Sequence, residues 1–302
     1  RRLGRTDDPR LHPWKPDTLL TRQMRVKVRS LYQLTHQITA ATNQLRAVLQ
    51  RYYSGVLQVF GDLTAQSALT FIQEYPTPEM ATQLDREEFH LFLRRQRYPN
   101  PHRLVARLAE LRNPSLQTTP DTGAIYQEEA VSQAQLLLQM VKSKLQTQRA
   151  LTALFKTHPD GDIFASLPGT GAFLAPALLV KFGDHRDRFP TAASVQALAG
   201  TCPVTDSGGH RHRIYFRQGC DHEFRHYAQQ WARASTERNR SQFADGYWHD
   251  ALDRGLSKHH AYRCLANRWL AIAWRLWQNR SVYDETYHLQ QRLRRFRPNS
   301  LT

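Results

Sequence analysis

Apolar side chains recur every three or four residues from Leu20 to Tyr52, and no glycine or proline interrupts this run before Gly55. The spacing is that of one face of an α-helix, so it predicts a helix of about nine turns. A second run of the same kind, from Ala124 to His158, predicts another long helix. The stripe is narrow, which favours a coiled coil, although an ordinary bundle helix fits the same spacing.

Residues Val56 to Asn113, between these runs, alternate short amphipathic stretches with breaks at Tyr75–Pro78 and Tyr98–Pro101. The breaks predict several short helices, one of which begins at Asp85 with acidic residues first, as the helix dipole prefers. A stretch rich in Pro, Thr and Ser from Asn113 to Gly123 predicts a loop. The fold class we expect is therefore mainly α, with a long antiparallel helix pair that carries a small helical insert.

The charge of the chain points to a polyanionic partner. The chain has 302 residues and a formal net charge of +16. Most of its cations are arginine, whose planar guanidinium group matches phosphate oxygens, so we expect nucleic acid. No apolar run approaches the roughly 20 residues of a membrane-spanning helix, and no signal peptide opens the chain. Three scattered cysteines do not suggest a disulfide framework, which favours a reducing cytoplasm, where a DNA-binding protein would associate with the nucleoid.

A tight turn, Leu167-Pro168-Gly169-Thr170-Gly171, joins two apolar stretches that predict helices over Asp162–Leu167 and Ala172–Phe182. The pattern resembles a helix-hairpin-helix motif, in which backbone N–H groups at the start of the second helix hold a phosphate. Gly169, Thr170 and Gly171 are thus candidate DNA-binding residues. A plain corner in the core is the alternative, and Pro176 predicts either a kink or a later helix start.

Ser207 is the candidate catalytic residue. It is expected in a loop, because Gly208 and Gly209 follow it and permit close approach of a backbone or phosphate. Serine needs an activating base or metal, which draws attention to the neighbouring Asp206, His210 and His212. A flexible loop without catalytic role has the same composition. The glycines and the cations beyond them are the other candidate DNA-binding residues: Gly208, Gly209, Arg211, Arg213 and Arg217.

Zinc is a weaker alternative for the same segment. Its candidate ligands are Cys202, His210, His212, Cys220 and His222. No two cysteines have the Cys-x-x-Cys spacing of structural zinc sites, so we assign no metal ligand.

Three further helices are predicted over His222–Asn239, Gln242–Arg254 and Lys258–Arg280, with a basic helical tail over Leu289–Arg297. Tryptophans at helical spacing in the third of these helices, such as Trp269 and Trp277, are expected in the core. Arg211 to Arg217 is expected to be a basic strand or loop.

The order of these features resembles the transposases of insertion-sequence family 110/1111, relatives of the Piv-type DNA invertases and described as bridge-RNA-guided recombinases. Leu11–Pro16, followed by a long helix, is similar to that family's linker into its coiled coil. The other motifs that carry the resemblance are Leu167–Gly171, Phe182-Gly183-Asp184, Arg188-Phe189-Pro190-Thr191, Leu198-Ala199-Gly200, Pro203, Ser207-Gly208-Gly209, Arg217-Gln218-Gly219, Phe224-Arg225, Arg254-Gly255, Lys258, Ala261, the helix Leu265–Leu276 and Tyr283-Asp284.

The resemblance implies a mechanism in two parts. An N-terminal RuvC-like domain of the family carries an Asp-Glu-Asp-Asp set that binds Mg²⁺, and a C-terminal transposase domain supplies a serine that becomes linked to a 5′ phosphate of DNA. Ser207 matches that serine. Asp7 and Asp8 lie too close to the linker to match the acidic set. The resemblance also implies a guide RNA and a homodimer or tetramer.

These observations predict four parts: a linker over 1–17, a coiled-coil region with its insert over 18–160, a transposase domain with the helix-hairpin-helix motif over 161–288 and a basic tail over 289–302. Because residue 1 is Arg and not Met, we expect the chain to begin inside a longer natural protein, after the RuvC-like domain. The predicted function is a DNA transposase or recombinase, and the chain alone is expected to bind nucleic acid without cutting it. The alternative is a non-catalytic nucleic-acid-binding scaffold, or the remnant of a degenerate element.

Overall fold

The computed structural model describes residues 15–112, 120–208, 211–237 and 240–296. The chain divides into two compact units: unit 1 comprises the residues up to Val28 and those from Ala150 onwards, and unit 2 comprises Arg29–Arg149. The two divisions lie inside long helices, whereas the predicted boundaries at residues 17 and 160 lie at the ends of these helices. The described residues are mainly helical, as expected, and none of their helices has the length and apolar character needed to cross a membrane.

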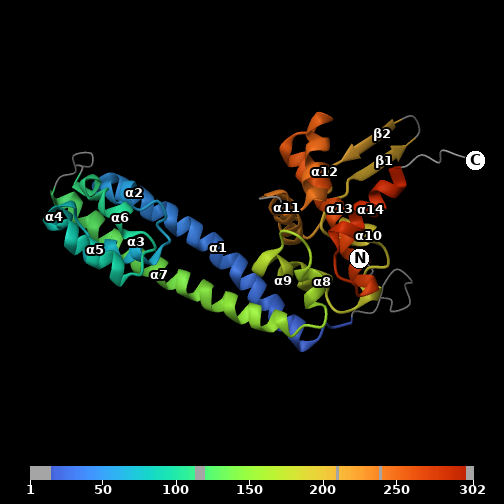
Figure 1. Ribbon diagram of the computed structural model, residues 1–302, viewed down its shortest axis with the longest axis horizontal. Helices are drawn as coiled ribbons and strands as arrows, with labels where there is room; N and C mark the ends of the chain where they lie inside the picture. The colour runs from blue at the N-terminus through green and yellow to red at the C-terminus, as the bar shows by residue number, and fades with distance from the viewer. Residues whose placement is uncertain (1–14, 113–119, 209–210, 238–239, 297–302) are drawn as a thin grey trace, which may run out of the picture. The chain divides into compact units, whose positions relative to one another are not determined.

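The two long helices are α1 (Leu19–Tyr52) and α7 (Pro120–Lys156). Within unit 2 they run side by side in opposite directions (Figure 1). The ring of Tyr52, at the end of α1, stacks on that of Tyr126, near the start of α7, with 6.4 Å between the ring centroids. The long antiparallel pair predicted from the spacing of apolar residues is therefore confirmed. Helix α7 begins at Pro120, inside the stretch predicted as a loop, because proline is favourable in the first turn of a helix.

Short helices fill the rest of unit 2. N-capping residues explain where two of these helices, α4 and α5, begin. The Thr77 hydroxyl accepts the N–H of Met80, and Asp85 and Glu88 form a capping box. The elements are α2 (Gly55–Val59), α3 (Gln66–Glu74), α4 (Pro78–Gln83), α5 (Arg86–Arg95), α6 (Pro101–Val105) and the 3₁₀ helix η1 (Leu108–Arg112). The predicted helical insert is confirmed, with its breaks at the two proline pairs.

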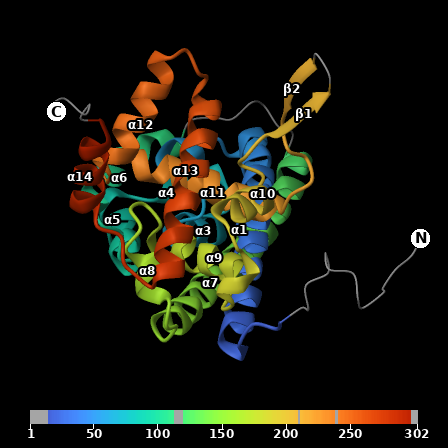
Figure 2. The ribbon, with the colours of Figure 1, turned by 90° about the vertical axis from the view of Figure 1, so that its right-hand side faces the viewer.

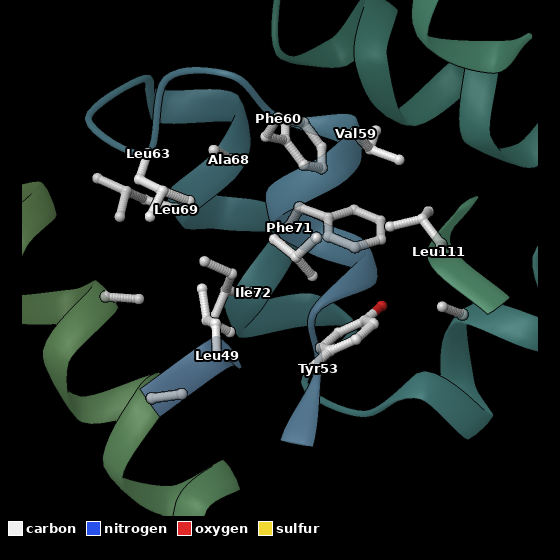
Figure 3. Packing of buried hydrophobic residues seen from close by; sticks show 14 of the residues in the cluster. Leu49, Tyr53, Val59, Phe60, Leu63, Ala68, Leu69, Phe71, Ile72 and Leu111 are labelled. Atoms are coloured by element: carbon white, nitrogen blue, oxygen red, sulfur yellow. The ribbon is translucent and has the colours of Figure 1, made fainter. Parts of the chain in front are cut away.

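The core of unit 2 is built around Phe71 of α3 (Figure 3). Its ring centroid lies 5.2 Å from that of Phe60, 5.7 Å from that of Phe89 and 5.5 Å from that of Phe92. Aromatic rings at these spacings contribute packing energy beyond the area that they bury. The insert therefore has a hydrophobic core of its own at the end of the helix pair.

The described part of unit 1 holds the helices beyond α7 and a β-hairpin, which projects from those helices (Figure 2). The elements are α8 (Gly161–Ala165), α9 (Gly171–Phe182), the 3₁₀ helix η2 (Arg186–Arg188), α10 (Ala192–Leu198), β1 (Val204–Gly208), β2 (Arg211–Tyr215), α11 (His222–Thr236), α12 (Gln242–Asp253), α13 (Lys258–Asn279) and α14 (Glu285–Phe296).

Tryptophans form the core of unit 1. Trp231, Trp269 and Trp277 are fully buried, and the first two stack with 5.2 Å between ring centroids. The buried indole N–H groups of this stacked pair find acceptors: Trp231 donates to the carbonyl of Pro168 and Trp269 to the hydroxyl of Ser235, each at 2.9 Å. The expected tryptophan core is confirmed.

The segment around Ser207 differs from its prediction. Ser207 and Gly208 belong to strand β1, which pairs with β2, and not to a loop. The Ser-Gly-Gly composition suggested a turn, but Val204 and Thr205 before it and Ile214 and Tyr215 after it are residues that favour strands. The predicted basic tail at Leu289 is the continuation of α14. Pro176 lies inside α9, so the second helix of the turn does not start late.

Candidate nucleic-acid interface

The hairpin sets the backbone position of the candidate nucleophile. The register of β1 and β2 places Ser207 opposite His212, and Gly208 opposite Arg211. Opposite positions of an antiparallel pair have Cβ atoms roughly 4.5–5.5 Å apart. Only the backbone is described for 206–208, 211 and 212, whereas Gly209 and His210 lie outside the described residues. The hairpin thus brings together four of the predicted positions, Ser207, His212, Gly208 and Arg211.

Apolar side chains near the end of β2 face solvent. Ile214 is 66% exposed, Tyr215 45% and Phe216 42%. The side chain of Arg213, a predicted DNA-binding residue, is also exposed, and its Nη1 lies 3.4 Å from the hydroxyl of Tyr215. Strand β2 therefore displays aromatic, apolar and cationic groups together, a combination suited to nucleic acid.

Two arginines, one from α11 and one from α13, contact the ring of Phe216, which directly follows β2. The guanidinium carbon of Arg225, on α11, lies 4.3 Å from the ring centroid of Phe216, and that of Arg263, on α13, lies 5.0 Å from it. Arg225 also donates a hydrogen bond to the carbonyl of Arg217. We call Phe216, Arg225 and Arg263 the Phe216 cluster. Phe216 lies inside the basic stretch Arg211–Arg217 that the sequence predicted to lie on a nucleic-acid backbone. Arg225 and Arg263 were not predicted site residues, although Phe224-Arg225 is one of the motifs of the resemblance.

A glycine allows the segment before β1 to pack on this base. Gly200 has a φ of +63°, and a Cβ there would lie 2.6 Å from Nη2 of Arg225 and 2.7 Å from Sγ of Cys220. The N–H of Asp221 donates to the carbonyl of Leu198 at 2.8 Å. A side chain at residue 200 would therefore displace Arg225, which links the Leu198-Ala199-Gly200 motif to the position of the hairpin.

The predicted phosphate-binding turn between α8 and α9 is largely occupied by internal contacts. Gly169 has a φ of +82°, and a Cβ there would lie 2.6 Å from the backbone nitrogen of Ser235. Thr170 is buried, and its hydroxyl lies 2.9 Å from the carbonyl of Leu167 and 3.1 Å from that of Phe164. Gly171, at the start of α9, is exposed, and a Cβ there would meet nothing within 4 Å. The turn thus offers an exposed helix start at Gly171 alone, and its phosphate role stays a prediction.

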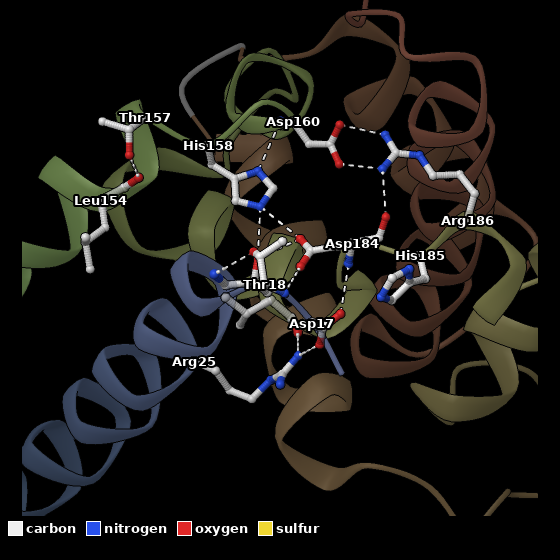
Figure 4. Close-up of polar contacts among 12 residues, drawn as sticks. Asp17, Thr18, Arg25, Leu154, Thr157, His158, Asp160, Asp184, His185 and Arg186 are labelled. Atoms are coloured by element: carbon white, nitrogen blue, oxygen red, sulfur yellow. Dashed lines mark hydrogen bonds and ion pairs between the residues drawn. The ribbon is translucent and has the colours of Figure 1, made fainter. Parts of the chain in front are cut away.

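A polar network in unit 1 lies outside every predicted site (Figure 4). Asp184, just after α9, accepts the backbone N–H of Thr18 and the hydroxyl of Thr21, both at 2.6 Å. His158 Nδ1 accepts the N–H of Asp160 at 3.1 Å, which leaves Nε2 as the ring nitrogen that can donate. That nitrogen lies 3.2 Å from Oδ1 of Asp184. Asp184 therefore caps the start of α1 and joins it to the segment after α7.

The carboxyl of Asp184 is held in its charged form. Burial raises its pKa, but hydrogen bonds from Thr21, Thr18 and His158 outweigh burial and bring the pKa below its ordinary value. Its backbone N–H donates to Asp17 at 3.0 Å, and Asp17 in turn pairs with Arg25.

Arg186 extends the network. It binds Asp160 through two hydrogen bonds, of 2.7 and 2.6 Å. Its guanidinium carbon lies 4.6 Å from the ring centroid of Trp277, and its Nε donates to the carbonyl of that residue at 3.1 Å. The charged groups pair with one another, which gives the network a structural role. No local sequence signal marks it, apart from the Phe182-Gly183-Asp184 motif.

Among the described residues, no three His, Cys, Asp or Glu side chains lie together in a way that could hold a metal ion. Of the zinc candidates, Sγ of Cys220 and Nδ1 of His222 are 3.9 Å apart. The side chains of His210 and His212 lie outside the described part of the chain.

Comparisons with known proteins find similarity to transposases. Residues 161–248, which contain the turn, the hairpin and Ser207, match the Transposase IS116/IS110/IS902 family. The chain is similar to a Streptomyces coelicolor protein named "Mini-circle putative transposase for IS117", with 25% identity over 287 residues, 93% of this chain and 69% of that protein. It is also similar to "Insertion element IS110 uncharacterized 43.6 kDa protein" of the same organism, with 26% identity over 63% of this chain and 47% of that protein. Residues 161–248 of the chain are therefore similar to the transposases of the IS116/IS110/IS902 family, and the similarity to the two Streptomyces coelicolor proteins extends over more of the chain.

Proposed function

We propose that this chain binds DNA and transfers a DNA strand in transposition, with Ser207 as the nucleophile. The observation that carries the proposal is the family match, because residues 161–248 include Ser207 and the whole hairpin. The basic and aromatic side chains on β2 and the net charge of +16 agree with it.

In the proposed step, Oγ of Ser207 attacks a backbone phosphorus. A bond from Oγ to phosphorus forms, the bond from phosphorus to O3′ breaks, and the DNA keeps a free 3′ hydroxyl and a 5′ phosphate linked to the protein. His212, opposite Ser207 in the register, is the candidate base that takes the serine proton. The leaving O3′ takes up a proton from protonated His212, which returns this candidate base to its starting state. Arg213 and Arg217 are proposed to balance the charge of the phosphates.

The family resemblance also implies Mg²⁺, a guide RNA and a dimer or tetramer. Among the described residues no three His, Cys, Asp or Glu side chains lie together, so we assign no magnesium ligand. We therefore derive no step through Mg²⁺. The guide RNA and the oligomer stay predictions of the resemblance.

Replacement of Ser207 in the full-length natural protein tests the proposal. Ser207→Ala should abolish the covalent protein–DNA adduct, measured with end-labelled DNA on a denaturing gel, because no hydroxyl is left to attack. Thr205→Ala is the matched control, since it removes an exposed hydroxyl from the same strand, and it should keep the adduct.

An adduct at wild-type level with Ser207→Ala would refute the assignment of the nucleophile. Tight DNA binding without any adduct in the wild-type protein would favour the alternative, a non-catalytic scaffold.

A further inference from the structure

We propose that the Phe216 cluster, together with the neighbouring Tyr215, is a binding site for an unpaired nucleotide. This inference rests on the proposed function only in that the ligand is nucleic acid. It adds the class of nucleic acid that this face of the hairpin recognises: a strand whose bases are not paired.

The first argument is charge. Arg225 and Arg263 come from two different helices and share one aromatic ring, at 4.3 and 5.0 Å from its centroid. No carboxylate among the described side chains forms an ion pair with either of them. Two like charges held near one ring repel each other unless an anion lies beside them. A phosphate oxygen is the anion that a nucleic-acid strand supplies, and guanidinium groups match its geometry.

The second argument is pre-organisation. Arg225 donates a hydrogen bond to the carbonyl of Arg217, and its Nε is buried. Gly200 leaves room for this guanidinium group and would displace it if it carried a Cβ. A cation that is already held in place loses less entropy when a ligand binds. The fold therefore holds Arg225 ready for an anion.

The third argument is the exposed aromatic surface. Tyr215 is 45% exposed and lies beside the cluster in sequence, with Arg213 at 3.4 Å from its hydroxyl. The bases of a duplex are stacked on each other, so an aromatic side chain can enter the stack only at the cost of unstacking, whereas an unpaired base exposes its face. A duplex would use the cations and leave the ring of Tyr215 in water. The combination of ring and cations thus favours an unpaired strand over a duplex.

The experiment measures binding by fluorescence anisotropy, with the full-length protein carrying Ser207→Ala so that no strand is cut. Three labelled probes of equal length are compared: a single-stranded DNA, the RNA of the same sequence, and the DNA duplex. Tyr215→Ser and Arg263→Gln should each weaken binding of at least one single-stranded probe about tenfold. Tyr215→Ser should change duplex binding less than about threefold, whereas Arg263→Gln should also weaken duplex binding, because a duplex uses the cations. The single-stranded probe that responds identifies the strand as DNA or RNA.

Matched controls remove the same groups elsewhere in unit 1. Arg268→Gln removes an exposed cation from α13, and Tyr287→Ser removes an exposed tyrosine from α14. Both should leave single-stranded binding within about twofold of its original value. Circular dichroism confirms that each variant is folded.

For Tyr215→Ser, equal losses for duplex and single strand would overturn the proposal, as would the absence of any loss for either probe. This outcome is distinguishable from a failure of the proposed function. Binding does not depend on the hydroxyl of Ser207, whereas the covalent adduct does.

Discussion

The carboxylate of Asp184 connects the start of α1 with the segment that follows α7. It accepts the backbone N–H of Thr18 and the hydroxyl of Thr21, and it lies within 3.2 Å of the ring of His158. Each hydrogen bond to a charged group contributes about 1.5–3 kcal/mol. One side chain thus holds the start of α1 and the end of α7 in unit 1.

Asp184→Asn should lower the free energy of unfolding by about 2–3 kcal/mol, because an amide cannot accept all of these donors. Urea denaturation followed by circular dichroism measures the loss. Asp187→Asn is the control: Asp187 pairs with Lys15 on the surface, where such pairs contribute little. Equal losses for the two variants would contradict the role of Asp184.

The same carboxyl makes stability depend on pH. Its pKa is lower in the folded chain than in the unfolded chain, so its stabilising contribution is complete above the ordinary value of 3.8. The contribution is lost as the pH falls through the folded pKa. The wild-type chain should therefore lose more stability than Asp184→Asn when the pH is lowered below that value. Parallel curves of unfolding midpoint against pH would contradict this expectation.

Two adjacent tyrosines of unit 2 should respond oppositely to loss of the hydroxyl. Tyr53 Oη is buried and has no hydrogen-bond partner among the described residues, whereas Tyr52 donates to the carbonyl of Pro76 at 3.1 Å. Tyr53→Phe should leave stability unchanged or raise it by about 1 kcal/mol, and Tyr52→Phe should lower it by about 1 kcal/mol. Thermal unfolding measures the stability of both variants. If Tyr53→Phe lost as much stability as Tyr52→Phe, the hydroxyl of Tyr53 would have a hydrogen-bond partner.

The turn between α8 and α9 packs closely against the backbone of α11 at Gly169 but not at Gly171. Gly169→Ala should destabilise unit 1 by about 3 kcal/mol, because it combines a positive φ with a contact of 2.6 Å to the backbone of α11. Gly171 also has a positive φ, but a Cβ there would contact nothing within 4 Å, so Gly171→Ala should lower the free energy of unfolding by about 1 kcal/mol. The difference between the two denaturation midpoints is the test. Equal midpoints would mean that α11 moves away from a Cβ at residue 169 without a loss of stability.

Helices were predicted from the sequence better than strands were. The spacing of apolar residues and the acidic helix start at Asp85 are local signals, so they mark α1 and α5 without knowledge of the fold. The hairpin depends on the pairing of two short strands around glycines. Each strand alone carries a weak signal, and Ser207 was therefore expected in a loop.

The charge of the whole molecule governs its affinity for nucleic acid. With a net charge of +16, binding should weaken steeply as salt is added, since the chain displaces counterions from phosphates. Contact with about six phosphates corresponds to a loss of roughly a thousandfold in affinity between about 50 and 200 mM salt. A titration at several salt concentrations measures the slope, and an affinity that is independent of salt would contradict the electrostatic argument.

The sequence by itself determined what depends on neighbours along the chain: the two long helices, the insert and the order of motifs that resembles the transposases. Tertiary structure alone decided which distant residues meet. Thr18 and Asp184 are 166 positions apart, and Phe216 receives its cations from two separate helices. Hydrogen bonds and ring contacts act over a few ångströms, so only the folded chain selects their partners.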